Sequence, residues 1–314
     1  MRLSILVVSR TAGLLNKMLS TLKDALHLPG EEVEVLCSWN GDAEEESRID
    51  NPSGYEFLVA NRAPYHFASN MNALAEKANG EVLLLINDDV LLDANSVDAA
   101  ISCLCDYPNT GLVGARLRDR VGSLTHAGIL FDRRHSPYHQ LDRLVSSEHH
   151  AVLGDPRPVP AVTGAAMVIR RKHFQALGFN TEYRVCGEDV ELCLALRRQF
   201  ELNVVYCPRF SGEHGGEATR SSEENQGGNS EDLTRMRRLH ERFLNTTSND
   251  QLRIELTANA IEADVLRSTI LAQAKQASDA LSSDNHNHWE DQTHALQLAR
   301  LKLEQRLKQA ERRA

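Results

Sequence analysis

The chain is organised around residues 81–90, Glu81-Val82-Leu83-Leu84-Leu85-Ile86-Asn87-Asp88-Asp89-Val90, in which five apolar residues lead directly into two adjacent carboxylates. A continuous apolar run of this length is typical of a strand that is buried on both faces of a sheet. The charges of Asp88 and Asp89 must reach water, a cation or a ligand, because an unpaired charge is costly to bury.

The position of this acidic pair suggests a function for it. Ligands of open α/β sheets bind beyond the carboxyl ends of the strands. A pair of carboxylates there is well placed to hold a divalent cation against a phosphate-bearing substrate. The alternative is an ordinary polar strand end, with Asp89 or Asp93 capping a following helix.

Length and composition limit the class of protein. The 314 residues are enough for one large domain, or one domain with an appendage, and a hydrophobic fraction of 41% is ample for a core. The net charge of −9 argues against nucleic-acid binding, because a phosphate backbone would be repelled. No run approaches the roughly 18 apolar residues of a membrane-spanning helix. We therefore expect no transmembrane segment, and a cytoplasmic protein that is free or lies peripherally at the inner face of the membrane.

Strand-like and helix-like patterns alternate through the first part of the chain. Strands are expected at residues 3–10, 32–37 and 55–60, and helices at 13–27 and 69–79. This alternation predicts an α/β fold in which a mostly parallel sheet is flanked by helices. Residues 135–160, which hold four prolines from Pro137 on, are expected to form a long irregular loop.

The character of the chain changes beyond Gly215. Residues 217–230 read as a flexible polar segment, and helical patterns follow at 231–243, 251–280 and 293–313. We expect two parts: a catalytic domain over residues 1–245 and a helical, coiled-coil-like extension over 246–314. The extension is a candidate for self-association or for docking onto a partner.

A second acidic cluster, Cys186-Gly187-Glu188-Asp189-Val190-Glu191-Leu192, lies at the start of a predicted helix. Acidic residues in a first turn stabilise the helix dipole, which is one explanation. The other is catalytic, because a carboxylate made more basic by like charges or by burial is what a general base for a hydroxyl requires. The residues alone leave both explanations open.

Three further predicted strands also end in polar residues. His214 stands in a glycine-rich turn, and imidazole with carboxylate suits Mn²⁺ or Mg²⁺ with open positions, although a lone histidine is usually an ordinary surface or core residue. Ser9-Arg10 and Asn40-Gly41-Asp42 end the first two strands, where a nucleotide base and ribose would be read. Polar strand ends are common, so this second signal is weak.

Taken in order, these pieces resemble the family 2 glycosyltransferases, which have the GT-A fold. The resemblance covers about residues 3–220. The matching pieces are "SILVVSR", "EVLCSWNGD", "FASNMNALAEKANGEVLLLINDDVLL", "GLVGARLRDRVGSLTHAGI", "AVTGAAMVIRRKHFQALGFN", "GEDVELCLALRR" and "VVYCPRFSGEHGG".

The resemblance implies roles for particular residues. The metal motif of the family falls on Asn87-Asp88-Asp89, so its first acid is absent, Asp89 is the expected metal ligand and Asp88 lies nearer the ribose. His214 corresponds to the second metal ligand. The acidic motif on Glu188-Asp189 makes Asp189 the expected catalytic base, with Glu188 beside it.

The remaining roles concern the donor and the acceptor. Trp39 stands where the family has an aspartate that reads uracil, which leaves Asn40 or Asp42 to substitute. The residues expected to bind the donor nucleotide are Ser9, Arg10, Asn40, Asp42, Asn70 and Asp88, and those expected to line the substrate pocket are His126, Thr163, Gly164 and Glu191.

The function implied is that of a metal-dependent, inverting glycosyltransferase. It would move a hexosyl or deoxyhexosyl group from a nucleoside-diphosphate sugar to a hydroxyl of a glycan, polysaccharide or lipid-linked acceptor, with Mn²⁺ or Mg²⁺ as cofactor. One alternative is a catalytically degenerate scaffold or interaction protein, favoured by Asn87 and Trp39. Another is a sugar nucleotidyltransferase, which is disfavoured because "SRTAGLLNK" holds a single glycine after the first strand.

Overall fold

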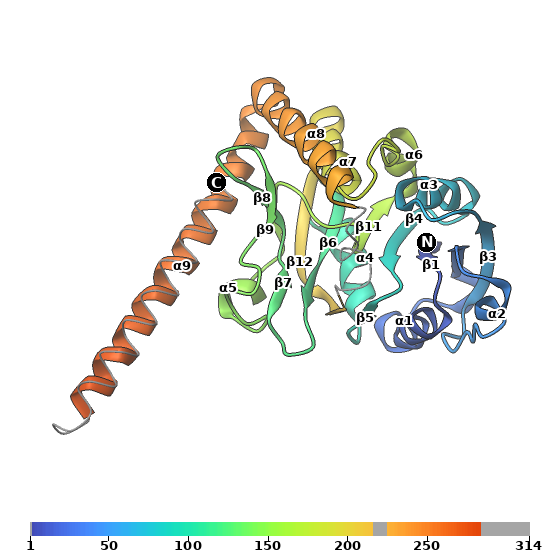
Figure 1. The fold of residues 1–314 in the computed structure, drawn as a ribbon, viewed down its shortest axis with the longest axis horizontal. Coiled ribbons are helices and arrows are strands. Elements are labelled where there is room, and N and C mark those ends of the chain that lie inside the picture. Colours follow the sequence, from blue (N-terminus) through green and yellow to red (C-terminus); the bar gives the residue numbers. More distant parts are fainter. Residues whose placement is uncertain (1, 216–224, 284–314) are drawn as a thin grey trace.

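The computed structural model describes residues 2–215 and 225–283. Its central feature is a mixed ten-stranded sheet in the order β10-β12-β6-β11-β4-β1-β2-β3, to which β5 adds beside β12 and β7 beside β6. The sheet is curled and flanked by helices, and one long helix projects from the body (Figure 1).

The strands are β1 (Leu3–Ser9), β2 (Val33–Trp39), β3 (Glu56–Arg62), β4 (Val82–Asn87), β5 (Val90–Leu92), β6 (Thr110–Arg118), β7 (Leu124–His126), β8 (Ile129–Phe131), β9 (Pro137–His139), β10 (Arg157–Pro158), β11 (Ala166–Arg170) and β12 (Asn203–His214). The helices are α1 (Ala12–Ala25), α2 (Ala43–Glu46), α3 (Phe67–Lys77), α4 (Ser96–Asp106), α5 (His150–Leu153), α6 (Arg171–Leu177), α7 (Glu188–Phe200), α8 (Asn225–Thr246) and α9 (Asn249–Ser283), with a short 3-10 turn, η1 (Gly30–Glu32).

Alternate residues of the central strands point to two separate cores. On β4, Val82, Leu84 and Ile86 pack with α1 and α4 on one face of the sheet. Leu83 and Leu85 pack on the other face with α3, α6, α7 and the start of the C-terminal helices. Both faces of β4 are therefore buried, as its continuous apolar run predicts.

The strand directions bring several chain segments to one edge of the sheet, namely the edge formed by the carboxyl ends of β1, β2 and β4. β1, β2 and β4 are parallel, so Ser9, Trp39 and Asn87 end at the same level. β11 runs antiparallel to both β4 and β6, and β12 runs parallel to β6. The end of β12 and the loop before β11 therefore lie at the same edge as the end of β4.

The segment between β8 and α7 is more ordered than its composition indicates. The expected long loop over residues 135–160 contains β9, α5 and β10, which are short elements joined by turns.

The predicted flexible segment, residues 217–230, is partly helical, because α8 already begins at Asn225; its residues 217–224 lie outside the described residues. The helix expected at 293–313 also lies outside them.

The C-terminal helices begin on the body and leave it. α8 packs against α7, and the buried residues Gln251, Ala258 and Val265 fix the first part of α9 to the same core. The rest of α9 projects away from the sheet, as Figure 1 shows.

Candidate active site

The loop after β4 carries a carboxylate that meets the end of β12. Nε2 of His214 lies 3.2 Å from Oδ1 of Asp89, and both side chains are partly exposed, at 22% and 14%. The backbone supports this pairing, because β12 pairs with β5 and the Gly215 amide donates to the Asp89 carbonyl at 3.1 Å. A carboxylate oxygen and an imidazole nitrogen so placed are suitable ligands for a divalent cation such as Mn²⁺.

The capping alternative does not hold for this loop. The N-cap residue of α4 is Asn95, and its side chain makes no capping hydrogen bond. Both carboxylate oxygens of Asp93 accept from Arg118, at 2.6 and 2.7 Å, and one of them accepts from the Ser211 hydroxyl at 2.6 Å. This cluster ties β5 to β6 and β12, and so holds the two sides of the Asp89–His214 pair together.

Within residues 2–215 and 225–283, no group of three or more His, Cys, Asp or Glu side chains surrounds a common metal position. Asp89 and His214 are a pair. Cations that bridge a protein to substrate phosphates commonly take one or two carboxylates from the protein. The chemistry of these two donors fits a divalent ion of that kind.

Asp88 points to a different partner from Asp89. Its Oδ2 accepts from the Ser9 hydroxyl at the end of β1, at 2.6 Å. Burial raises the pKa of Asp88 to about 6, against the Ser9 hydrogen bond, which lowers it, and with the negative charge of Asp89, which raises it. Asp88 is therefore held between β1 and β4, at the place where the two central strands end.

Asp189 stands in the first turn of α7, next to the loop before β11. Its Oδ2 accepts from the Gly164 amide at 2.7 Å, and its Oδ1 accepts from the Val190 amide at 2.7 Å. The N-cap of α7 is Gly187, at a φ of 119°, where a Cβ would meet the Tyr183 ring at 2.6 Å. A glycine is therefore required at the entry to the helix that carries the acidic pair.

The same loop connects Asp189 to the end of β4. The Ala165 carbonyl accepts from the Asn87 amide at 2.9 Å, one residue from the Gly164 amide that binds Asp189. Two of the acidic segments predicted to lie at this edge are thus joined through two consecutive backbone residues, Gly164 and Ala165.

The residues expected at the donor side have different positions. Arg10 is exposed beside Ser9, and its positive charge acts to lower the pKa of Asp88. Asn40 donates from its backbone to the Ser9 carbonyl at 2.8 Å, and its Oδ1 is buried with no hydrogen-bond partner among the described residues. Asp42 caps α2 by accepting from the Glu45 amide at 2.8 Å.

Three other expected residues have their polar groups engaged within the fold. Asn70 is buried and accepts from the His66 amide at 2.9 Å. The Glu191 carboxylate accepts from Asn180 at 3.2 Å, on the side of α7 away from Gly164. His126 is 1% exposed and lies beneath Thr163, whose amide donates to its Nε2 at 3.3 Å.

Comparison with known proteins adds to this geometry. No protein-family model matches the chain. The O-antigen biosynthesis protein RfbC of Myxococcus xanthus is 33% identical over 141 residues, which make up 43% of this chain and 11% of that protein. The N-acetylglucosaminyl-diphospho-decaprenol L-rhamnosyltransferase of Mycobacterium tuberculosis is 27% identical over 130 residues, 35% of this chain and 39% of that protein. The chain thus spans less than half the length of either curated relative.

Solved structures match over more of the chain. The mannosyltransferase PcManGT from Pyrobaculum calidifontis, in complex with GDP-Man and Mn²⁺, aligns over 99% of this chain and 84% of that one, with a TM-score of 0.62 and 15% identity. S. aureus TarS in complex with UDP aligns over 85% of this chain and 71% of that one, with a TM-score of 0.52 and 14% identity. This chain has the GT-A fold. Together with the sequence relatives, the fold shows the resemblance to family 2 glycosyltransferases.

One residue at this edge of the GT-A sheet, Tyr65, was not predicted from the sequence as a site residue. Tyr65, in the loop between β3 and α3, is 50% exposed. Partial burial and the negative charges of Glu188, Asp88 and Asp89 raise its pKa, so it lies within the field of both acidic segments. Its only signal in the sequence is an aromatic residue after Pro64 in a strand-to-helix loop.

In the part of the chain that the structure describes, no helix combines the length and the apolar character that crossing a membrane requires.

Proposed function

We propose that this chain is a metal-dependent glycosyltransferase that moves a sugar from a nucleoside-diphosphate sugar to an acceptor hydroxyl with inversion of the anomeric centre. The observation that carries the proposal is the meeting of the Asp89–His214 pair with the Asp189 loop at one sheet edge. Oδ1 of Asp89 and Nε2 of His214 are 3.2 Å apart, and residues 163–165 bind both Asp189 and Asn87.

Each residue has a proposed task in the reaction. Asp89 and His214 would hold the cation, which supplies positive charge to the leaving diphosphate when it is bound. The Asp189 carboxylate takes the proton of the acceptor hydroxyl as its oxygen bonds to the anomeric carbon. The bond from that carbon to the diphosphate oxygen breaks at the same time, and the electron pair leaves with the nucleoside diphosphate.

Backbone hydrogen bonds prepare Asp189 for this task. Both of its oxygens are bound by amides, so the carboxylate is oriented before an acceptor arrives. The amides occupy part of its accepting capacity, and a carboxylate retains further lone pairs for a hydroxyl proton. Glu188, in the same first turn, would add negative charge beside it.

We propose that Asn40 recognises the donor base, in place of the aspartate that the family has at the position of Trp39. Trp39 is buried, and its Nε1 donates to the Asp42 carbonyl at 3.2 Å, so its ring fills the corner after β2. The unpartnered Oδ1 of Asn40 lies next to it. Because this oxygen is buried, the Asn40 amide would have to turn outward to accept from a base N–H, with Ser9 and Asp88 nearer the ribose.

The relatives support a substrate class. The names of the two sequence relatives refer to O-antigen biosynthesis and to rhamnosyl transfer onto a diphospho-decaprenol acceptor. We propose a hexosyl or deoxyhexosyl donor, and an acceptor in a polysaccharide under assembly, either a glycan or a lipid-linked intermediate.

The test is release of nucleoside diphosphate from a panel of UDP-, GDP- and dTDP-sugars, with Mn²⁺ or Mg²⁺ and with EDTA. We expect turnover of at least one donor that EDTA abolishes. Failure to turn over any donor, with or without an added glycan acceptor, would contradict the proposal. Turnover that is unchanged in EDTA would contradict the metal dependence of the proposed reaction.

We also propose that the helical extension, residues 246–314, mediates self-association of the catalytic domain, residues 1–245. On the projecting part of α9, Leu271 is 64% exposed and Ile270 is 39% exposed, which favours contact with another surface. Exchanging both for glutamate should lower the sedimentation coefficient to that of a monomer. An identical sedimentation coefficient in the two proteins would refute self-association through this face.

A further inference from the structure

Residues Thr163, Gly164 and Ala165 bind three separate parts of the molecule. The Ala165 carbonyl accepts from Asn87, and the Gly164 amide donates to Asp189 Oδ2 at 2.7 Å. The Thr163 amide donates in a third direction, to Nε2 of His126 at 3.3 Å. The tripeptide therefore connects the proposed base to a buried histidine.

The state of His126 follows from its surroundings. It lies at the end of β7 and is 1% exposed. Burial, and then the positive charges that His139 and His214 would carry, lower its pKa well below the ordinary value, so the ring is neutral. A neutral imidazole that accepts at Nε2 carries its proton on Nδ1. That nitrogen lies 3.1 Å from Nδ1 of His139, which itself donates to the Thr125 carbonyl at 2.9 Å and so does not accept from His126.

His139 is held in turn by the C-terminal helix. It ends β9, and its neighbour Tyr138 donates its hydroxyl to Glu262 of α9 at 2.6 Å. The other oxygen of Glu262 accepts from the Leu141 amide at 3.1 Å. The amide of Gln140 also donates to the Ala258 carbonyl of α9, at 3.1 Å. β9 is thus fixed on both sides of His139.

We propose that His126 is a positioning residue for Asp189. By accepting from Thr163 it fixes the peptide plane between Val162 and Thr163, which adjoins the plane that carries the Gly164 amide, and so limits how far that amide can turn away from the Asp189 carboxylate. The inference rests on the proposed function, in which Asp189 is the base. Because a displacement of about 1 Å in a reacting group can cost a hundredfold in rate, loosening this loop should slow the chemical step.

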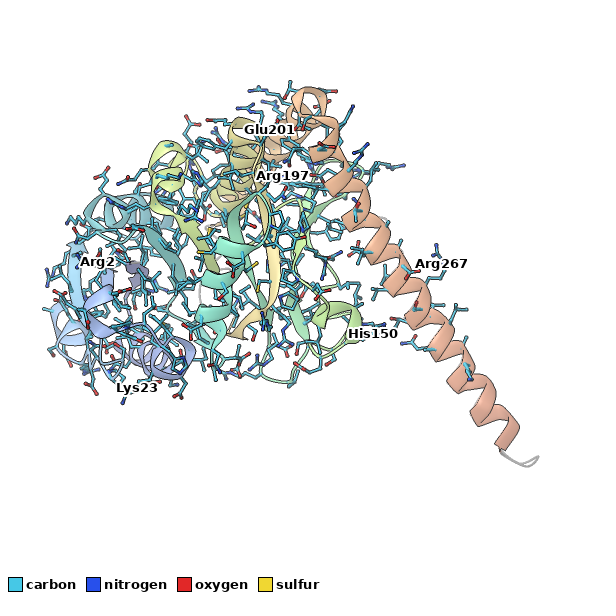
Figure 2. The ribbon with its side chains drawn as sticks, turned by 180° about the vertical axis from the view of Figure 1, so that it is seen from behind. Arg2, Lys23, His150, Arg197, Glu201 and Arg267 are labelled. Carbon is cyan, nitrogen blue, oxygen red and sulfur yellow. The ribbon has the colours of Figure 1, made fainter. Side chains whose placement is uncertain are left out.

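Replacing His126 by leucine tests the proposal, because leucine fills similar space and leaves the Thr163 amide without an acceptor. We expect His126→Leu to lower kcat by about tenfold or more, with the donor KM within about twofold of wild type. His126→Gln, whose side-chain oxygen can accept from the same amide, should recover most of the loss. His150→Leu, at an exposed histidine on α5 (Figure 2), is the matched control and should leave kcat unchanged.

Amide hydrogen exchange gives a readout that does not depend on activity. In His126→Leu the amides of residues 163–165 should exchange faster than in wild type, while those of β1 and β4 do not change. Unchanged exchange at 163–165 would overturn the inference, whatever the donor panel shows. Absence of turnover in the donor panel would count separately, against the proposed function. A kcat within twofold of wild type, equal losses in the leucine and glutamine variants, or a KM that rises with the fall in kcat also overturns the inference.

Discussion

Asp189→Asn should lower the rate of sugar transfer by about 10²–10⁴-fold, the contribution expected of a general base. Asparagine has the same shape, so its amide oxygen can still accept from Gly164 and keep the loop in place, while its NH2 group replaces the oxygen that accepts from Val190 and that hydrogen bond is lost. The ability to take the acceptor proton is also lost. Binding of the nucleoside diphosphate with Mn²⁺ should be unchanged, because Asp189 is not one of the two proposed metal ligands.

The measurement is single-turnover transfer with saturating donor, alongside titration of the nucleoside diphosphate. Asp98→Asn is a matched control, since Asp98 forms an exposed pair with His27 at the N-terminal part of α4. Full activity of Asp189→Asn would refute the assignment of the base. Loss of nucleotide binding together with activity would instead indicate a structural role for Asp189.

Arg197→Leu should lower the free energy of unfolding by about 3–5 kcal/mol. Arg197 is fully buried on α7, near the start of α9 (Figure 2), and donates to Glu255 at 2.6 Å and to Gln251 at 2.8 Å. Its guanidinium also stacks on Phe243 of α8, 4.6 Å from the ring centre. Its removal leaves the Glu255 carboxylate buried without its main partner.

The Arg197–Glu255 pair also predicts how stability depends on pH. Burial raises the pKa of Glu255, but the contacts with His240 and Arg197 together lower it below the ordinary value of 4.5. A carboxyl whose folded-state pKa is lowered stabilises the fold at pH values above its ordinary pKa. This stabilisation is lost as the pH falls below 4.5 toward the folded-state pKa. Glu255→Gln should therefore flatten the acid side of the stability profile.

Urea unfolding at several pH values measures both effects. Arg253→Ala is the control, because Arg253 pairs with Asp250 on the exposed face of α9, and its loss should not shift the midpoint. A midpoint for Arg197→Leu that equals the wild-type value would mean that α9 does not depend on this anchor. The pair would then not be what fixes the start of α9 to α7.

The fold was readable from the sequence where one physical signal dominated. The run from Val82 to Ile86 predicts a strand covered on both faces, and it is one. The alternation of strand and helix predicts the parallel arrangement of β1, β2 and β4. The antiparallel insertion of β11 between β4 and β6 carries no local signal, because residues 166–170 read as a strand in either direction.

The candidate site was readable in part for a related reason. Polar residues that directly follow an apolar strand pattern can be recognised in the sequence, as Asp88, Asp89 and His214 can. Contacts made across the sheet do not, and the Ser9–Asp88 and Asp93–Arg118 hydrogen bonds join residues that are distant in sequence. Arg197 shows the limit most clearly, since "ALRRQ" gives no sign that one arginine is buried and the next exposed.

Two expected pocket residues illustrate how local pattern differs from position. Glu191 belongs to the same acidic cluster as Asp189, but two residues along a helix is a rotation of about 200°, so its carboxylate faces Asn180. His126 lies beneath the Thr163 loop and not on its surface. The sequence predicts both as pocket residues, but the direction of each side chain depends on packing, which the local pattern does not give.

The central claim is that Asp89 and His214 bind a divalent cation that holds the donor diphosphate beside Asp189. Isothermal titration of UDP, GDP and dTDP, each with and without Mn²⁺, tests it most directly when wild type is compared with Asp89→Ala, His214→Ala and Asp189→Asn. We expect at least one nucleotide to bind only with Mn²⁺, both alanine variants to lose this binding, and Asp189→Asn to keep it. Binding that is equally tight without Mn²⁺, or equally tight in Asp89→Ala, would contradict the account.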